Sequence, residues 1–123
     1  MTKEQVLNQF WNSFGLPAYD ENTVPDEVEM PYITYSVSTD SLDEPVLLYA
    51  SLWYEGMSWK SISNKSAEIA EYIVEQIPPA IPYDGGRLYI TKGTPFVQRM
   101  SEPGNINIRR ILINIQAEFM SSY

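Results

Sequence analysis

The first apolar positions of the chain recur with the period of an α-helix. They are Val6, Leu7, Phe10, Trp11 and Phe14. Thr2-Lys3-Glu4-Gln5 overlaps the start of this pattern and fits a capping box, in which the Thr hydroxyl and the Gln side chain satisfy each other's free amides. Gly15 suits a helix end, and Pro17 prevents the helix from resuming. The pattern therefore predicts a first helix that stops at Gly15.

Two strands are expected after this helix. Residues 17–31 hold three prolines and five acids and are predicted to form an extended loop. A loop of this length inside one domain is typical of functional or partner-ordered segments. Pro31 opens a strand whose side chains alternate as far as Val37. The next strand, residues 46–54, is largely apolar on both faces, which predicts burial on both sides.

A second helix follows Gly56, with Ser58 as its predicted N-cap. Its predicted buried face consists of Ile62, Ile69, Ala70, Ile73, Val74 and Ile77. Pro78-Pro79 ends it. Asp84-Gly85-Gly86 is a turn signal, which predicts a third strand over residues 87–92. A loop is expected next, and its candidate contact residues are Phe96, Val97, Arg99 and Met100.

The last predicted strand, about residues 105–119, changes phase along its length. One face of its far half carries Ile111, Ile113, Ile115, Ala117 and Phe119. Ile106 and Ile108 point the opposite way, because side chains in a strand alternate with a period of two. The switch falls at Arg109-Arg110. It fits either a bulge or twist at that point, or an arm whose near half packs against a neighbouring subunit.

The predicted order of elements is helix, two strands, helix, two strands. We expect a single α+β domain over residues 1–123, with antiparallel strand pairs and both helices packed on one face of the sheet.

Histidine and cysteine are both absent from the chain. Their absence removes the usual general base near neutral pH, the thiolate nucleophile and the commonest transition-metal ligands. Asp26, Glu27 and Glu29 could supply oxygen ligands, yet the spacing and the glycine of a calcium loop are missing. A pair of hydrolytic carboxylates such as Asp40 and Asp43 is allowed but has no supporting motif. We therefore expect no catalytic residue, no metal and no cofactor.

Sixteen acids face eight bases, which gives a net charge of −8. Residues 4–58 contain ten acids and neither lysine nor arginine. Such a surface repels phosphate backbones, so we expect no direct nucleic-acid binding by this half of the chain and no direct sequence-specific nucleic-acid binding by the protein. The acidic half is interpreted either as a solvated face or as a docking surface for a basic partner. No long apolar run and no basic-then-apolar leader is visible, so we expect neither a membrane span nor secretion.

Several segments resemble the tail-terminator and tail-completion proteins of long-tailed bacteriophages. They are Phe14-Gly15-Leu16-Pro17-Ala18-Tyr19, the acidic loop with Val24-Pro25, Pro31-Tyr32-Ile33-Thr34-Tyr35, and Trp53-Tyr54-Glu55-Gly56-Met57-Ser58-Trp59 before an Ile-rich helix. The Gly85-Gly86 turn and the long final strand fit the family layout as well. The similarity covers most of the chain, and its motifs are structural rather than chemical.

This resemblance implies a non-enzymatic virion protein, made in the host cytoplasm and resident in the tail or neck. Such proteins assemble into a ring, typically a hexamer, at the head-proximal end of the tail tube. There they end tube polymerisation and join the tail to the head, so the implied partners are other copies of the chain, the tail tube protein and the head–tail connector proteins. Terminator and adjacent neck or completion proteins both fit these motifs.

Charge suggests where the contacts of such a ring would lie. A ring joins unlike faces of neighbouring subunits, and opposite charges on the two faces help to set their register. The hypothetical interface residues are Arg99, Arg109, Arg110, Phe96 and Met100 on one side and Asp26, Glu27 and Glu29 on the other. The alternative function is a stand-alone acidic protein of the immunity type that masks a basic surface of its partner.

Overall fold

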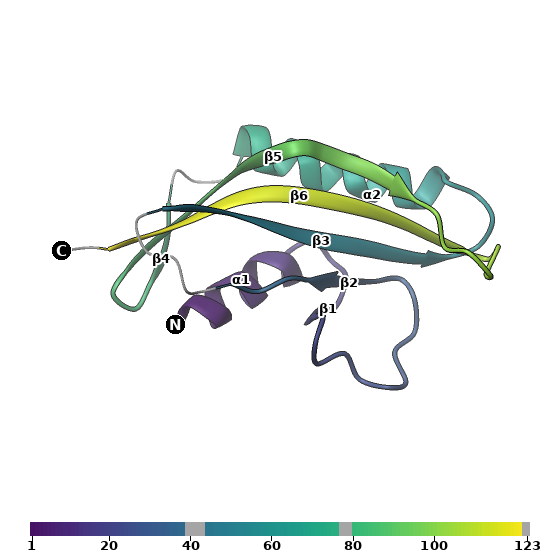
Figure 1. Ribbon diagram of the computed structural model, residues 1–123, viewed down its shortest axis with the longest axis horizontal. Coiled ribbons are helices and arrows are strands. Elements are labelled where there is room, and N and C mark those ends of the chain that lie inside the picture. Colours follow the sequence, from purple (N-terminus) through teal and green to yellow (C-terminus); the bar gives the residue numbers. More distant parts are fainter. Residues whose placement is uncertain (39–43, 77–79, 122–123) are drawn as a thin grey trace.

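Six strands form one curled sheet in a computed structural model that describes residues 1–38, 44–76 and 80–121 (Figure 1). The elements are α1 (Lys3–Asn12), β1 (Ala18–Asp20), β2 (Tyr32–Tyr35), β3 (Pro45–Glu55), α2 (Lys60–Glu71), the π-helical turn η1 (Tyr72–Gln76), β4 (Ile81–Tyr83), β5 (Gly86–Met100) and β6 (Ile108–Ser121). The strand order is β1-β2-β3-β6-β5-β4. The three long strands β3, β6 and β5 therefore lie side by side in the middle of the sheet.

The predicted fold class, α+β built from antiparallel strand pairs, is wrong. The structure is mostly β, and its single sheet is mixed because β1 runs parallel to β2 while every other neighbouring pair is antiparallel. The predicted order of two helices, each followed by two strands, roughly fits. Two short edge strands, β1 and β4, were not predicted.

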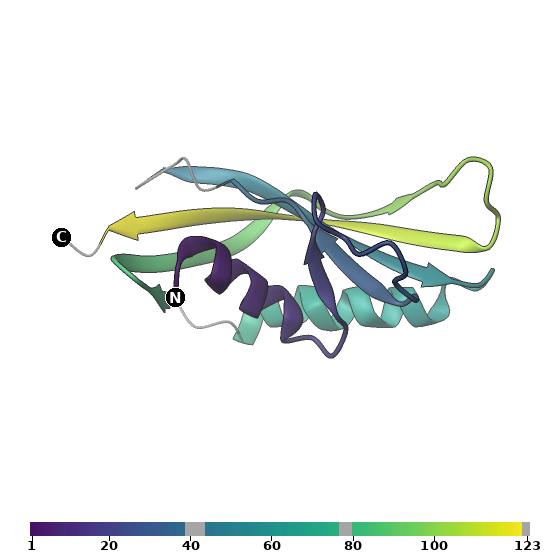
Figure 2. The same cartoon turned by 90° about the horizontal axis from the view of Figure 1, so that it is seen from below.

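Both helices lie on the same side of the sheet (Figure 2). α2 contacts the central strands β3, β5 and β6, whereas α1 contacts β1 and β4, the two edge strands. The sheet thus curls around α1. The buried core lies in this concavity, and its largest fully buried side chains are Trp11, Phe119, Leu7, Ile33, Leu48, Leu52, Ile62, Ile69, Leu88, Ile113, Ile115 and Val6.

The capping box at the start of α1 is confirmed. The Thr2 hydroxyl accepts from the Gln5 amide at 3.1 Å, and the Gln5 side chain accepts from the Thr2 amide at 2.9 Å. The helix ends at Asn12, and Gly15 then takes the left-handed conformation (φ +85°) that closes the joint. Lys65 of α2 donates to the Phe14 carbonyl at 2.9 Å, which ties this joint to the second helix.

β1 lies within the stretch predicted to be an extended loop. Its register pairs Ala18 with Ile33 and Asp20 with Tyr35. The Asn12 side chain completes the outer edge, because its Oδ1 accepts from the Ala18 amide at 3.0 Å and its Nδ2 donates to the Ala18 carbonyl at 3.2 Å. A side-chain amide thus takes the place that a further strand would occupy.

The predicted burial of β3 on both faces is wrong. Leu48, Ala50 and Leu52 face the helices and are buried, but the opposite face is partly open. Leu47 on that face is 56 % exposed, and Trp53 is half-buried. Apolar side chains on this second face therefore remain available for contacts.

The phase change in the last strand involves no bulge at Arg109-Arg110. β6 pairs with β3 without interruption from Ile108 to Glu118, and Ile106 lies before the strand begins. The irregularity lies in β5 instead, between Lys92 and Val97. Most of the loop predicted after residue 92 is thus part of β5.

The second helix begins close to its predicted start. The N-cap position is Trp59 and has no side-chain cap, while the Ser58 hydroxyl accepts from the Lys60 amide at 3.1 Å. Ile62, Ile69 and Ile73 are buried as predicted, but Val74 is 59 % exposed. The expected helix end at Ile77-Pro78-Pro79 lies outside the described residues.

Candidate assembly surfaces

The described residues contain no cluster of three or more acids that could hold a metal ion. The carboxylates Asp40 and Asp43 lie outside the described residues. In residues 1–38, 44–76 and 80–121, no helix is long and apolar enough to cross a membrane.

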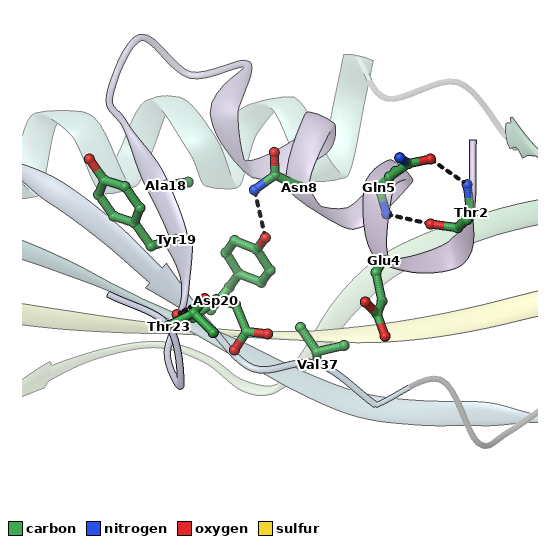
Figure 3. A pocket seen from close by; sticks show the side chains of 10 residues that line it. Thr2, Glu4, Gln5, Asn8, Ala18, Tyr19, Asp20, Thr23 and Val37 are labelled. Carbon is green, nitrogen blue, oxygen red and sulfur yellow. Dashed lines mark hydrogen bonds between the residues drawn. The ribbon is translucent and has the colours of Figure 1, made fainter. Parts of the chain in front are cut away.

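A hollow of about 440 Å³ lies between α1 and the β1–β2 end of the sheet (Figure 3). Asn8 donates to the Tyr35 hydroxyl at 2.7 Å, and the carboxylates of Glu4 and Asp20 line the same hollow. Burial raises the pKa of Tyr35 above its ordinary 10.0, the Asn8 hydrogen bond opposes this, and the charges of Asp20 and Glu4 add to the rise. The result is a negatively charged hollow around a protonated tyrosine, without a nucleophile–base pair.

A second surface is centred on Trp59, just before α2. The Cζ atoms of Arg99 and Arg109 lie 4.7 Å and 5.2 Å from the centroid of its ring. Two of the most exposed apolar side chains, Met57 (64 %) and Ile106 (72 %), border it, since Arg109 binds the carbonyls of both residues. We call Met57, Trp59, Val97, Arg99, Ile106 and Arg109 the Trp59 patch.

The two arginines of the Trp59 patch have different hydrogen-bond partners. Arg109 donates from Nε and Nη2 to the Met57 carbonyl at 3.0 and 2.7 Å, and from Nη1 to the Ile106 and Ile108 carbonyls at 2.9 and 3.3 Å. It thereby fastens the β3–α2 connection to the β5–β6 connection. The side chain of Arg99 is exposed and has neither a hydrogen bond nor an ion pair with any described residue.

Arg110 lies on the opposite face of the sheet from the Trp59 patch. Its guanidinium stacks on Trp53 at 4.8 Å, donates to the Ser51 hydroxyl at 3.0 Å and pairs with Glu102 at 3.3 Å. Trp53 in turn stacks on Tyr32. Arg110 thus already has a carboxylate and an indole as partners within its own chain.

The apolar residues among the candidate contact residues of the predicted loop lie in different parts of the molecule. Phe96 is half-buried against the core, Val97 is 40 % exposed in the Trp59 patch, and Met100 is half-buried beside its register partner Arg110. The expected single contact surface of Phe96, Val97 and Met100 is therefore not formed. Of these three residues, Val97 alone joins Arg99.

The acids Asp26, Glu27 and Glu29 are all exposed. Their loop joins β1 to β2, at the edge of the sheet farthest from β5 and β4, and hangs below β2 in Figure 1. No ion pair links these acids to an arginine of the described chain. The acidic loop therefore adjoins β1 and β2, whereas Val97 and Arg99 of the Trp59 patch lie on β5; Glu29 at the end of the loop lines a hollow together with Glu55 at the end of β3.

Trp59, Met57 and Ile106 were not among the predicted site residues. Trp59 belongs to a segment singled out for its resemblance, but a tryptophan next to a helix start does not by itself indicate which cations stack on it. Comparison with known proteins adds no assignment, since no protein-family model and no curated protein matches the chain.

Proposed function

We propose that this chain is a non-enzymatic assembly protein of a long-tailed bacteriophage. Copies of it form a ring at the head-proximal end of the tail tube, end tube polymerisation and provide the surface that joins tail to head. In the resembled family the ring is typically a hexamer. Its partners are further copies of itself, the tail tube protein and the connector proteins of the neck.

The segments that carry the resemblance are neighbours in space, which supports this proposal. The stretch around Ala18-Tyr19 pairs with Ile33-Thr34, and Tyr32 pairs with Trp53 in the next strand. Three of the segments that carry the similarity therefore belong to one continuous piece of sheet and its joint to α1.

The observation that carries the proposal is that the acidic loop and Arg99 belong to different parts of the sheet, with β3 and β6 between them. The acidic loop adjoins the β1–β2 edge, and Arg99 lies on β5 toward the other edge. A ring needs two unlike surfaces on each subunit, so that every copy contacts the next one head to tail. Opposite charge on these surfaces favours one register and opposes contacts between like surfaces.

Tube growth tests the proposal. Tail tube protein of the same phage is polymerised with increasing amounts of this protein, and tube lengths are measured by electron microscopy. We expect tubes to shorten as the protein is added, because a ring on the growing end blocks further subunits. Tube lengths that are independent of the protein concentration would contradict the proposal.

The hollow lined by Glu4 and Asp20 favours one alternative, an acidic protein that masks a basic surface of another protein. The hollow and the acidic loop adjoin β1 and would present one continuous negative surface. Such a protein binds its partner as a single copy and leaves tube growth unchanged, so the same assay separates the two functions.

A further inference from the structure

We propose that the Trp59 patch binds the acidic loop, Val24 to Glu29, of a second copy of this chain. The inference rests on the ring of the proposed function and names the contact that would build it. It also assigns the arginines different roles: Arg99 reaches the neighbour, whereas Arg109 and Arg110 mainly hold their own chain.

Arg99 is prepared to bind an anion. Stacking on Trp59 restricts its side chain, so less conformational entropy remains to be lost when a partner binds. A guanidinium offers five N–H donors in a planar fork that matches a carboxylate, and in Arg99 none of them is used by a described residue. An exposed arginine side chain without a stacking partner would sample many rotamers. Stacking on the Trp59 indole limits the orientations of the Arg99 guanidinium.

The charge of the patch is uncompensated within the described chain. The guanidiniums of Arg99 and Arg109 share one indole, so they lie within about 10 Å of each other, roughly one Debye length at 0.1 M salt. No carboxylate of the described residues lies within ion-pair distance of either one. In a chain with sixteen acids and eight bases, this local excess of positive charge favours an acidic partner.

Exposed apolar side chains surround these charges. Met57, Val97 and Ile106 are 64 %, 40 % and 72 % exposed. Interfaces of specific complexes are enriched in Trp, Met and Arg, with apolar contacts at the centre and polar groups at the rim. The patch thus has the composition of a protein contact rather than that of a site for a free small anion.

The acidic loop of a second copy has the matching chemistry. Its acids Asp26, Glu27 and Glu29 are exposed, and the apolar side chains Val24 and Val28 of the same loop are half-buried. The loop contains no base. An apolar and acidic segment would therefore meet an apolar and cationic patch.

The loop and the patch are not joined to each other within one chain. No ion pair links Asp26, Glu27 or Glu29 to Arg99 or Arg109 among the described residues, so both surfaces remain available to another copy. The outer edge of β1 is closed at Ala18 by Asn12, which disfavours joining copies there by adding a strand. The proposed contact between the acidic loop of one copy and the Trp59 patch of the next uses side chains and needs no open strand edge.

Charge reversal with rescue tests this contact on tail tubes. Arg99→Glu should reduce the fraction of tube ends that carry a ring by about tenfold or more, which corresponds to about 1.4 kcal/mol or more in the free energy of forming the whole ring. The triple change Asp26→Lys, Glu27→Lys and Glu29→Lys should have the same effect. Combining all four changes in one chain should restore part of the ring occupancy lost by either reversal alone, because the acidic side chain at position 99 then faces lysines, while Arg109 keeps its charge.

Two matched variants control for nonspecific effects. Arg87→Glu makes the same substitution at another exposed position of β5, and Glu71→Lys reverses an exposed acid of α2. Both should occupy tube ends as the wild type does. Circular dichroism with urea denaturation checks that every variant is folded.

The outcomes separate this inference from the proposed function. Rings formed equally well by the wild type and by Arg99→Glu would overturn the loop contact and leave the ring proposal standing. If the folded combined variant stays unassembled while both single reversals lose the ring, the two surfaces do not meet each other and the inference is wrong. A wild type that never occupies tube ends would overturn both proposals.

Discussion

Replacing Asn12 with Ala should open the outer edge of β1 and destabilise the fold. Asn12 supplies both a donor and an acceptor to Ala18, whose backbone lies at that edge, and Ala18 is 4 % exposed. In the variant, water has little access to the Ala18 amide and carbonyl. The free energy of unfolding should therefore fall by more than it would if two hydrogen bonds at the surface were lost.

The expected magnitude follows from these two bonds. Each typical hydrogen bond contributes about 0.5–1.5 kcal/mol to stability, and a buried group left without a partner costs about 1–3 kcal/mol. Alanine forms helices better than asparagine, so the substitution at the end of α1 also stabilises the fold by about 0.5 kcal/mol. Two bonds at the stronger end of their range contribute about 3 kcal/mol together, so we expect the free energy of unfolding to fall by about 2.5 kcal/mol after the gain from alanine is subtracted.

Urea denaturation followed by circular dichroism measures this loss. With a urea dependence of about 2 kcal/mol per M, the midpoint should fall by about 1 M. Asn64→Ala is the matched control, because Asn64 is exposed on α2 and its side chain has no hydrogen-bond partner among the described residues. If the two variants unfold at the same urea concentration, Asn12 does not close the edge as described.

Three further predictions concern local contacts. Thr2→Ala should lower the free energy of unfolding by about 1 kcal/mol, measured in urea, because the N-cap bond to Gln5 is lost. Gly93→Ala should lower it by about 1–3 kcal/mol, since the new Cβ would lie 2.9 Å from the Asn114 backbone; unchanged stability would show that β5 can shift there. The pKa of Tyr35 is raised on folding, so its stabilising effect is complete below pH ~10 and is lost as pH rises through the folded pKa. Tyr35→Phe should therefore reduce the alkaline decline of stability in urea titrations at several pH values, and an undiminished decline would contradict this.

Features set by local chemistry could be predicted from the sequence. The capping box needs only two side chains three residues apart, and it formed as expected. The buried face of β6 likewise follows from its period-two pattern. Such patterns depend on residues that are close along the chain, so they can be predicted without knowing which distant segments come into contact.

Features set by distant partners could not be predicted. β1 is three residues long and exists because β2 pairs with one of its sides while Asn12 closes the other. The apolar second face of β3 predicted burial, but no described element covers Leu47. Apolar composition shows that a face can be buried and does not show what covers it.

The roles of the arginines in the candidate site could not be predicted from the sequence either. Arg99, Arg109 and Arg110 look alike in the sequence, yet their hydrogen bonds differ completely. Arg109 binds carbonyls from two connections, Arg110 pairs with Glu102, and Arg99 alone remains stacked and unpaired among the described residues. These roles depend on which distant segments meet, and no spacing along the chain encodes them.

Electron microscopy of tube ends tests the central claim, that copies of this chain form a closed ring on the tail tube. Tubes of the same phage are imaged with and without the wild-type protein, and images of their ends are averaged. We predict a closed ring with rotational symmetry at one end of each tube, present only when the protein is added. Ends that look the same in both samples, with the protein left free in solution, would contradict the account.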